Sequence, residues 1–129
     1  MSKTDYTRPG FGTVTPYLIV RNAPRLIEFL VEVFGARELR RDLHADGSIM
    51  NAELLIGTSV VELAEAGETW PAFPAALHTY LPDTDATYAK ALAAGASSLY
   101  APADMPYGER SAGIQDPCGN HWFLATYQE

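Results

Sequence analysis

The sequence predicts an α+β fold: two tandem βαβββ modules that form a curled mixed β-sheet around a cleft, with the helices on the outer face. A β-branched and aromatic stretch at residues 14–20, typical of a strand, runs directly into an amphipathic helix. The signal that ends this helix, FGA at residues 34–36, recurs as AGA at residues 94–96, sixty positions later. Turns at Gly57 and Gly119 each precede a closing strand. Because the same order of elements occurs twice, each half is interpreted as one copy of a repeated unit.

The first half begins with this strand and helix. Asn22 is expected to accept a hydrogen bond from a free N–H of the first helical turn, and Pro24 is tolerated there because its missing N–H would be unpaired in any case. Gly35 supplies the left-handed residue that ends the helix. The apolar stripe of the helix consists of Leu26, Ile27, Phe29, Leu30, Val33 and Phe34. Further strands are expected at residues 36–43, 48–56 and 59–64, with turns at residues 45–47 and 57–58.

The second half follows a loop at residues 65–75, which a glycine and two prolines mark. A strand at residues 76–81 leads to Asp83, a predicted helix cap, and then to a helix at residues 85–94 that Gly95 ends. The remaining elements are strands at residues 97–100, 109–115 and 121–127, a proline-containing loop at residues 101–108 and a tight turn at residues 116–120.

The chain is long enough for one domain with a sizeable core. Its 129 residues are divided into a flexible tail at residues 1–12 and a single domain at residues 13–129, with module 1 at about residues 13–65 and module 2 at about residues 75–128. The net charge of −7 disfavours binding to nucleic acid or to an anionic membrane, and it favours cationic ligands. Cys118 is the only cysteine, which excludes an intrachain disulfide and a thiolate metal cluster. No apolar run is long enough to span a membrane, and the first twelve residues lack a signal-peptide core, so a cytoplasmic location is expected.

Four segments of the chain resemble the vicinal oxygen chelate superfamily, which includes glyoxalase I, ring-cleaving dioxygenases and bleomycin-resistance proteins. They are TPYLIVRNAPRLIEFLVEVFGA at residues 15–36, VVEL at 60–63, DTDATYAKALAAGA at 83–96 and YGERSAGIQDPCGNHWFL at 107–124. The PYL, FGA, YGxR and DPxGNxW patterns within them identify a branch of this superfamily with largely unassigned function. The resemblance covers about residues 14–127 and implies the paired-module fold.

Metal-dependent members of this superfamily bind their ion with four side chains, one from the first and one from the last strand of each module. The resemblance assigns these positions to Thr15, Glu62, Ala76 and Phe123, of which only Glu62 is a competent ligand. One carboxylate does not hold a divalent ion tightly, so no cofactor is expected, and a divalent metal at another position is the alternative. The register around Ala76 stays open, because a shift of two residues would put His78 in the ligand position.

Strand alternation extends the expected cleft beyond these four positions. His78 and Tyr80 are expected to point into the cleft from one strand, and His121 and Phe123 from another. Glu62, His78 and His121 could then form a two-His-one-carboxylate metal site, displaced from the position that the family uses. The alternative is that both histidines are hydrogen-bonded residues of a half-buried sheet.

Two of the candidate residues have more than one interpretation. Glu62 is either a general base with a histidine neighbour or a structural carboxylate paired with Arg110 or a tyrosine hydroxyl. Arg110 either contacts an anionic group of a ligand or caps its own loop. Trp122 is expected to face the helix as part of the core, and Cys118 is not expected to act as a nucleophile.

The sequence therefore predicts a small-molecule-binding protein similar to the bleomycin-resistance type, which holds a ligand in an aromatic-lined cleft without turning it over. The alternative is a metal-dependent lyase, isomerase or dioxygenase that uses Glu62, His78 and His121. In resembling proteins a second subunit often completes the cleft, so a homodimer is expected. The candidate ligand-binding residues are Tyr17, His78, Tyr80, Tyr107, Arg110, His121 and Phe123, with Trp70 as a further aromatic side chain and Glu62 as the candidate catalytic residue.

Overall fold

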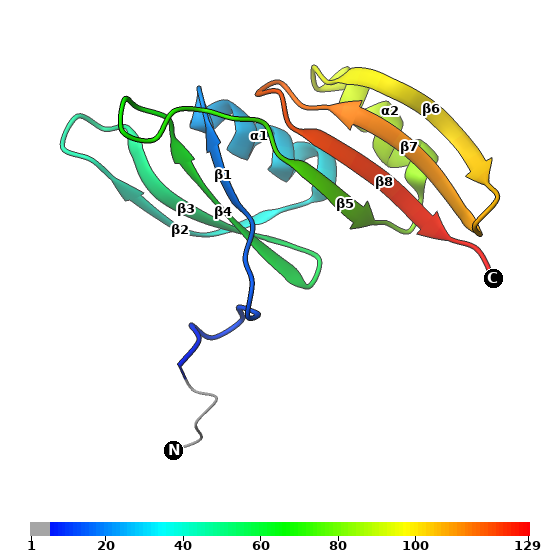
Figure 1. Cartoon of the computed structure of the whole chain (residues 1–129), viewed down its shortest axis with the longest axis horizontal. Coiled ribbons are helices and arrows are strands. Elements are labelled where there is room, and N and C mark those ends of the chain that lie inside the picture. Colours follow the sequence, from blue (N-terminus) through cyan, green and yellow to red (C-terminus); the bar gives the residue numbers. More distant parts are fainter. Residues whose placement is uncertain (1–5) are drawn as a thin grey trace.

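The computed structural model describes residues 6–129, which form two modules of one helix and four strands each (Figure 1). Module 1 contains β1 (Tyr17–Val20), α1 (Ala23–Phe34), β2 (Arg37–Leu43), β3 (Ile49–Ile56) and β4 (Ser59–Glu65). Module 2 contains β5 (Ala76–Tyr80), α2 (Thr84–Ala93), β6 (Ser97–Met105), β7 (Glu109–Gln115) and β8 (His121–Tyr127). This order of elements confirms the two predicted βαβββ modules. Within residues 6–129, neither helix is long and apolar enough to cross a membrane.

Both modules have the same sheet topology. The strand order is β1-β4-β3-β2 in module 1 and β5-β8-β7-β6 in module 2. The first strand of each module runs parallel to the last one, and all other neighbouring strands are antiparallel. The two sheets lie side by side and carry both helices on the same side (Figure 1). The α+β class, with mixed sheets and outer helices, is therefore confirmed.

The hydrophobic core lies between the helices and the sheets and is continuous across both modules. Leu26 and Phe29, on the apolar stripe of α1, are completely buried. Phe34, at the end of α1, packs against Trp122 of β8 with 4.9 Å between the ring centroids. Trp122 is also buried, and its indole N–H donates a hydrogen bond of 2.8 Å to Asp116. Trp122 thus faces the helices, as predicted, and joins the two modules into one core.

The start of α1 differs from the expectation. Asn22 has a left-handed backbone (φ 69°, ψ 57°), and its side chain makes no capping hydrogen bond. A capping side chain normally belongs to a residue with an extended backbone, so this conformation is unsuited to the predicted role. Instead, the Glu65 carboxylate at the end of β4 accepts the N–H groups of Asn22 and Ala23, each at 2.8 Å. The predicted Asn22 cap is wrong, because a carboxylate from another strand supplies a charged acceptor at the positive end of the helix dipole.

The other predicted helix ends are confirmed. Gly35 follows α1 with φ 66°, and its N–H donates to the carbonyl of Val31 at 3.1 Å. Asp83 precedes α2, and its carboxylate accepts the N–H of Ala86 at 3.0 Å. Gly95 lies just beyond α2 with φ 105°. Glycine tolerates these positive φ angles at no steric cost, which is why both helices end where the sequence indicates.

Two strands have bounds that differ from the predicted ones by more than one residue. β1 begins at Tyr17 rather than at residue 14, and β6 continues to Met105 through most of the stretch predicted as a loop. β6 is the edge strand of its sheet, so Pro102 can lie in it without removing a hydrogen bond from a central ladder. The register between β6 and β7 shifts on both sides of Tyr100. The prolines therefore mark an irregular edge strand rather than a loop.

The sequence predicts a flexible tail at residues 1–12, of which residues 1–5 lie outside the described residues. In the described part of this segment, Nε of Arg8 lies 3.7 Å from Oε2 of Glu53 on β3. The segment that precedes β1 therefore contacts the sheet of module 1.

Candidate ligand-binding site

We call the face of each sheet that points away from the helices its open face. On module 1, Tyr17, Glu62 and Glu53 lie directly beside one another on β1, β4 and β3. Opposed residues of paired strands point to the same face, and the neighbouring residues Leu18 and Leu63 point into the buried core. The open face of module 1 therefore carries one tyrosine and two carboxylates in a row.

A pocket of about 470 Å³ lies on this face, beside Tyr17. Its walls come from β1, β3 and β4, from the turn between β2 and β3, and from the loop that joins the modules. The Tyr17 side chain is 46% exposed and that of Trp70 is 69% exposed, so both rings offer surface to a ligand. Glu65 also borders the pocket, but its carboxylate is bonded to the start of α1. The lining residues are Tyr17, Ile19, His44, Met50, Ala64, Glu65 and Trp70.

The sequence identified Tyr17 and Trp70 as candidates but not the other five lining residues, which are Ile19, His44, Met50, Ala64 and Glu65. Between β2 and β3 the register shifts, so that Met50 is an extra residue between the paired positions of Ile49 and Asn51. Such a bulge breaks the simple alternation of side chains along a strand. Alternation alone could not have placed Met50 in the pocket, because the bulge is not visible in the sequence.

Asn51 forms a polar border beside the pocket. Its Nδ2 lies 3.0 Å from Oε1 of Glu62 and 3.4 Å from the hydroxyl of Tyr17. Glu62 is therefore a hydrogen-bonded carboxylate on the open face. Its partner is Asn51, whereas the structural interpretation named Arg110 or a tyrosine hydroxyl.

Glu53 lies on the other side of Glu62 from Tyr17 and was not identified from the sequence. Its side chain is only 8% exposed, whereas the side chain of Arg8, its ion-pair partner at 3.7 Å, is 56% exposed. Glu53 is two residues after Asn51 on β3, and residues two apart on a strand share a face. This spacing is the sequence feature that could have placed Glu53 on the same face as Asn51. The sequence did not show which residue of β3 opposes Glu62.

The open face of module 2 holds a second polar cluster, around Glu109. The hydroxyl of Tyr80 donates a hydrogen bond of 2.5 Å to Oε2 of Glu109, and Nε2 of His78 lies 3.6 Å from Oε1. The hydrogen bond to Glu109 raises the pKa of Tyr80 above its ordinary value, because ionising the phenol would remove the bond and place two negative charges together. Glu109 is almost buried and was also missed, although it lies two residues before Ser111 on the same face of β7.

The other aromatic candidates of module 2 also lie on or near the open face. The ring centroids of His121 and Phe123 are 6.4 Å apart, and Tyr100 stacks on Phe123 with its centroid also at 6.4 Å. The Tyr100 hydroxyl is 2.8 Å from that of Ser111. Tyr107, in the turn between β6 and β7, is 64% exposed. His78, Tyr80, His121 and Phe123 thus share one face, as strand alternation predicted.

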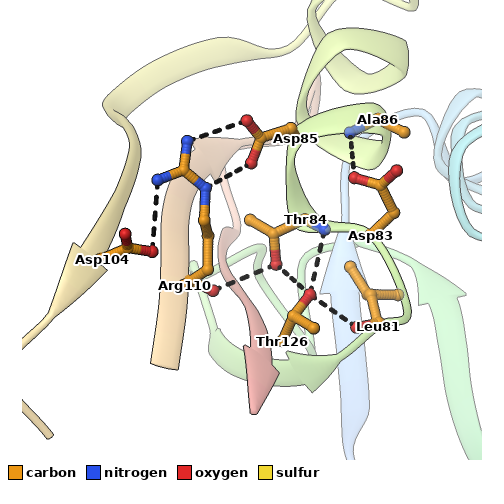
Figure 2. Close-up of polar contacts among 8 residues, drawn as sticks. All are labelled: Leu81, Asp83, Thr84, Asp85, Ala86, Asp104, Arg110 and Thr126. Atoms are coloured by element: carbon orange, nitrogen blue, oxygen red, sulfur yellow. Dashed lines mark hydrogen bonds and ion pairs between the residues drawn. The ribbon is translucent and has the colours of Figure 1, made fainter. Parts of the chain in front are cut away.

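Arg110 points to the helix side of module 2, where it holds the start of α2 (Figure 2). Its Nε and Nη2 donate to the two oxygens of Asp85 at 2.8 and 2.9 Å, and its Nη1 lies 3.4 Å from Asp104. These bonds lower the pKa of Asp85 and raise the pKa of Arg110. The Thr84 hydroxyl contacts both the carbonyl oxygen of Arg110, at 3.2 Å, and the hydroxyl of Thr126, at 2.8 Å. Arg110 therefore ties α2 to β6 and β7.

The strand pairing bears on the register that the sequence left open. The sequence assigned the first-strand positions to Thr15 and Ala76. In the structure, the residues beside Glu62 and Phe123 are Tyr17 and His78, two positions later in the chain. Within residues 6–129, no three His, Cys, Asp or Glu side chains form a group that could hold a metal ion. Glu62 belongs to module 1, while His78 and His121 belong to module 2, and one chain does not bring the three together. Even when the register is shifted by two residues, so that His78 takes the ligand position, Glu62, His78 and His121 of one chain do not fit a divalent ion.

A second hollow, of about 720 Å³, lies between the modules. It is bordered by the chain before β1, by the start of β4 and by β5, and His78 and Tyr80 contribute to its wall. The predicted site residues are therefore divided between two places. Tyr17 lines the pocket of module 1, while His78 and Tyr80 lie at the junction of the modules.

Cys118 lies in the turn between β7 and β8. Its Sγ is 3.4 Å from the carbonyl oxygen of Arg21, and burial raises the pKa of the thiol to about 11. A thiol with a raised pKa is a poor nucleophile at neutral pH, in agreement with the expectation from the sequence.

Comparison with known proteins gives one matching family and several similar structures. The model of the Glyoxalase/Bleomycin resistance protein/Dioxygenase superfamily matches residues 10–124. An uncharacterised protein of Mycobacterium bovis is 33% identical over 122 residues, which cover 86% of this chain and 80% of that protein.

Two solved structures illustrate the range of the structural similarity. TioX from Micromonospora sp. ML1 has a TM-score of 0.76 and 27% identity, over 90% of this chain and 99% of that one. The fosfomycin resistance protein FosX from Mesorhizobium loti has a TM-score of 0.64 and 21% identity, over 89% of this chain and 91% of that one. At this identity the second similarity concerns the fold alone.

Proposed function

Because the chain belongs to the Glyoxalase/Bleomycin resistance protein/Dioxygenase superfamily, we propose that it is a small-molecule-binding protein of this type, with its ligand in the pocket of module 1. The observation that carries the proposal is the pocket wall, in which the exposed rings of Tyr17 and Trp70 accompany the apolar side chains of Ile19 and Met50. Its volume of about 470 Å³ lies within the usual range for small-molecule sites. Apolar and aromatic surface favours a ligand with a flat, largely apolar body.

The proposed activity is binding without metal-dependent turnover. In the register of the paired strands, the four positions at which metal-dependent relatives hold their ion are Tyr17, Glu62, His78 and Phe123. Only Glu62 and His78 are good ligands. They belong to different modules, and Oε1 of Glu62 already accepts a hydrogen bond from Asn51. Two ligands on separate open faces do not satisfy the coordination of a divalent ion. The strand pairing that puts His78 in a ligand position is the observation that favours the lyase, isomerase or dioxygenase alternative.

We also propose that a second copy of the chain completes the site. The open faces of both modules expose large aromatic side chains, among them Tyr80 and Tyr127 of module 2, which are more than 60% exposed. A homodimer that covers the open faces would bring the module 2 candidates His78, Tyr80, Tyr107, His121 and Phe123 near a bound ligand. Light scattering on the purified chain would then give twice the monomer mass of 14.1 kDa, and a monomer at micromolar concentration would contradict the dimer. A cytoplasmic location, compatible with the single cysteine, belongs to the same proposal.

The two tryptophans provide a direct test of the proposed pocket. Trp70 is 69% exposed at the pocket, whereas Trp122 is buried in the core. A compound library is screened by thermal shift, and each compound that raises the melting temperature is then titrated while tryptophan emission is recorded. We expect emission of the wild type to change and that of Trp70→Phe, which retains only Trp122, to stay constant.

Two further variants test which side chains of the pocket contribute to ligand affinity. Tyr17→Ala and Trp70→Ala remove aromatic walls of the pocket and are expected to weaken binding about tenfold each, in line with the loss of one well-packed aromatic contact. Phe73→Ala is the matched control, since Phe73 lies in the same loop as Trp70 and is 58% exposed but does not line the pocket. Ligands that bind all variants equally well would contradict the proposed site.

A further inference from the structure

We propose that the module 1 site selects ligands with a cationic group, which replaces the guanidinium of Arg8 above Glu53. This inference rests on the proposed function and names the chemical class of the ligand. The ligand would combine a flat, apolar or aromatic body for the Tyr17–Trp70 pocket with a protonated amine, amidine or guanidine for the carboxylates beside it.

The two carboxylates of the open face require positive charge near them. Glu53 and Glu62 are directly opposed on neighbouring antiparallel strands, so their side chains point to the same face. Like charges in opposed positions destabilise a sheet, and a buried carboxylate without a partner is more costly still. The Glu53 side chain is only 8% exposed, which makes it the carboxylate that needs a cation most.

Arg8 supplies that cation, but only loosely. Its Nε is 3.7 Å from Oε2 of Glu53, which is longer than a hydrogen bond, and its side chain is 56% exposed. It belongs to the segment before β1, outside the paired strands. Arg40 opposes Glu53 on β2, but its Nε donates to Asp42 at 2.9 Å. A ligand cation can therefore take the place of Arg8 without disturbing a strand.

The carboxylates lie beside the pocket and do not line it. Asn51 contacts both Glu62, at 3.0 Å, and the hydroxyl of Tyr17, at 3.4 Å, so polar contacts connect Glu62 to the Tyr17 wall of the pocket. Tyr17 and Glu53 lie two strands apart, which is about 10 Å at the usual strand spacing. A ligand of ordinary size can therefore reach from the aromatic wall to Glu53, and the position of its cationic group is defined relative to its ring.

The test compares two flat probes that differ in charge. Proflavine, an acridine with two amino groups, is a cation at pH 8, whereas acridine itself is neutral at that pH. Their dissociation constants are measured by fluorescence for the wild type, Glu53→Gln and Arg8→Gln. Glu32→Gln, on the exposed face of α1, and Arg37→Gln, on β2, are matched controls that change the net charge by the same amounts elsewhere. Melting curves establish that Glu53→Gln is folded, and Arg8→Gln tests the same contact from an exposed side chain.

We expect proflavine to bind the wild type at least about tenfold more tightly than acridine, as a charge-assisted contact would give. Glu53→Gln should abolish most of this preference, Arg8→Gln should strengthen proflavine binding, and neither should change acridine binding. Equal affinity for the two probes, or a preference that both variants leave unchanged, would overturn the inference. If the inference is overturned in this way but binding of both probes still depends on Trp70, the proposed pocket is supported and only the selection for a cationic group is wrong. Binding of neither probe would overturn the inference and the proposed pocket together.

Discussion

The Tyr80 hydroxyl connects a buried carboxylate to an exposed aromatic surface. Glu109 is almost covered by protein, and its two oxygens face Tyr80 at 2.5 Å and His78 at 3.6 Å. The charge of this carboxylate is therefore satisfied by one phenol and, in part, by an imidazole. Tyr80 remains a hydrogen-bond donor over a wider pH range than an isolated tyrosine, because its pKa is raised.

A titration of the tyrosines tests this contact. The raised pKa means that the hydrogen bond stabilises the fold fully below the ordinary tyrosine pKa of 10.0, and that this stabilisation is lost as the pH rises through the higher folded-state value. We expect the difference in absorbance at 295 nm between the wild type and Tyr80→Phe to appear above pH 10. In the Glu109→Gln background the same difference should move to lower pH. An unchanged difference would show that Glu109 does not control Tyr80, and Glu38→Gln is the remote control.

Individual site residues could be predicted from the sequence only where alternation within one strand was sufficient. His78 and Tyr80 share a face because they are two apart on β5, and Trp122 faces the helices because it lies between His121 and Phe123 on β8. The surroundings of Glu53 and Glu109 are formed by residues on neighbouring strands. The sequence does not show which residues of two strands are paired, so these carboxylates could not be identified from it. Arg110 could not be assigned either, because its partner Asp85 lies on a helix 25 residues earlier in the chain, and the sequence does not show that the two side chains meet on the helix side of the sheet.

At the scale of elements, Glu65 couples β4 to the start of α1. Both oxygens of its carboxylate accept backbone N–H groups, from Asn22 and Ala23. The strand that forms one wall of the pocket thus also fixes where the first helix begins. The sequence indicated the position of this helix but not the identity of its cap, since Glu65 lies 43 residues after Asn22.

Replacing Glu65 tests this coupling. Glu65→Ala leaves two N–H groups of the first turn without their acceptors and should lower the free energy of unfolding by about 1–3 kcal/mol. Glu65→Gln retains one neutral acceptor and should lose less. Urea unfolding followed by circular dichroism measures both, with Glu68→Ala in the adjacent loop as the control. A loss no larger than that of the control would exclude a capping role.

The packing of β6 on β7 depends on a glycine under an aromatic ring. A Cβ at Gly113 would lie 2.5 Å from Cε1 of Tyr100 and 3.2 Å from Cβ of Leu99. Gly113→Ala should therefore cost about 1–3 kcal/mol of stability, as overpacking of a filled site usually does. In a Tyr100→Ala background the same substitution should cost clearly less, because the ring is gone. Equal costs in the two backgrounds, measured by urea unfolding, would contradict the predicted clash.

At the scale of the whole molecule, the repeat was the strongest signal in the sequence. Two helix-end glycines sixty positions apart predicted two modules, and both modules have the same strand order. The pocket could not be predicted in the same way, because a bulge in β3 and the loop between the modules form part of its wall. Repeats specify a backbone, whereas a binding site depends on the places where the two copies differ.

One such difference concerns the metal. Tyr17 and Glu62 of module 1 correspond in the sheets to His78 and Phe123 of module 2, so each module contributes a single side chain able to ligate an ion. Two ligands from separate open faces do not bind a divalent ion tightly. We therefore expect untagged protein, incubated with Ni²⁺, Zn²⁺, Mn²⁺ or Fe²⁺ and then desalted, to retain far less than one ion per chain. Glu62→Ala and His78→Ala should retain no less than the wild type. Near-stoichiometric metal that is lost in both variants would contradict this prediction, and it would favour a metal-dependent enzyme whose site is assembled from two chains.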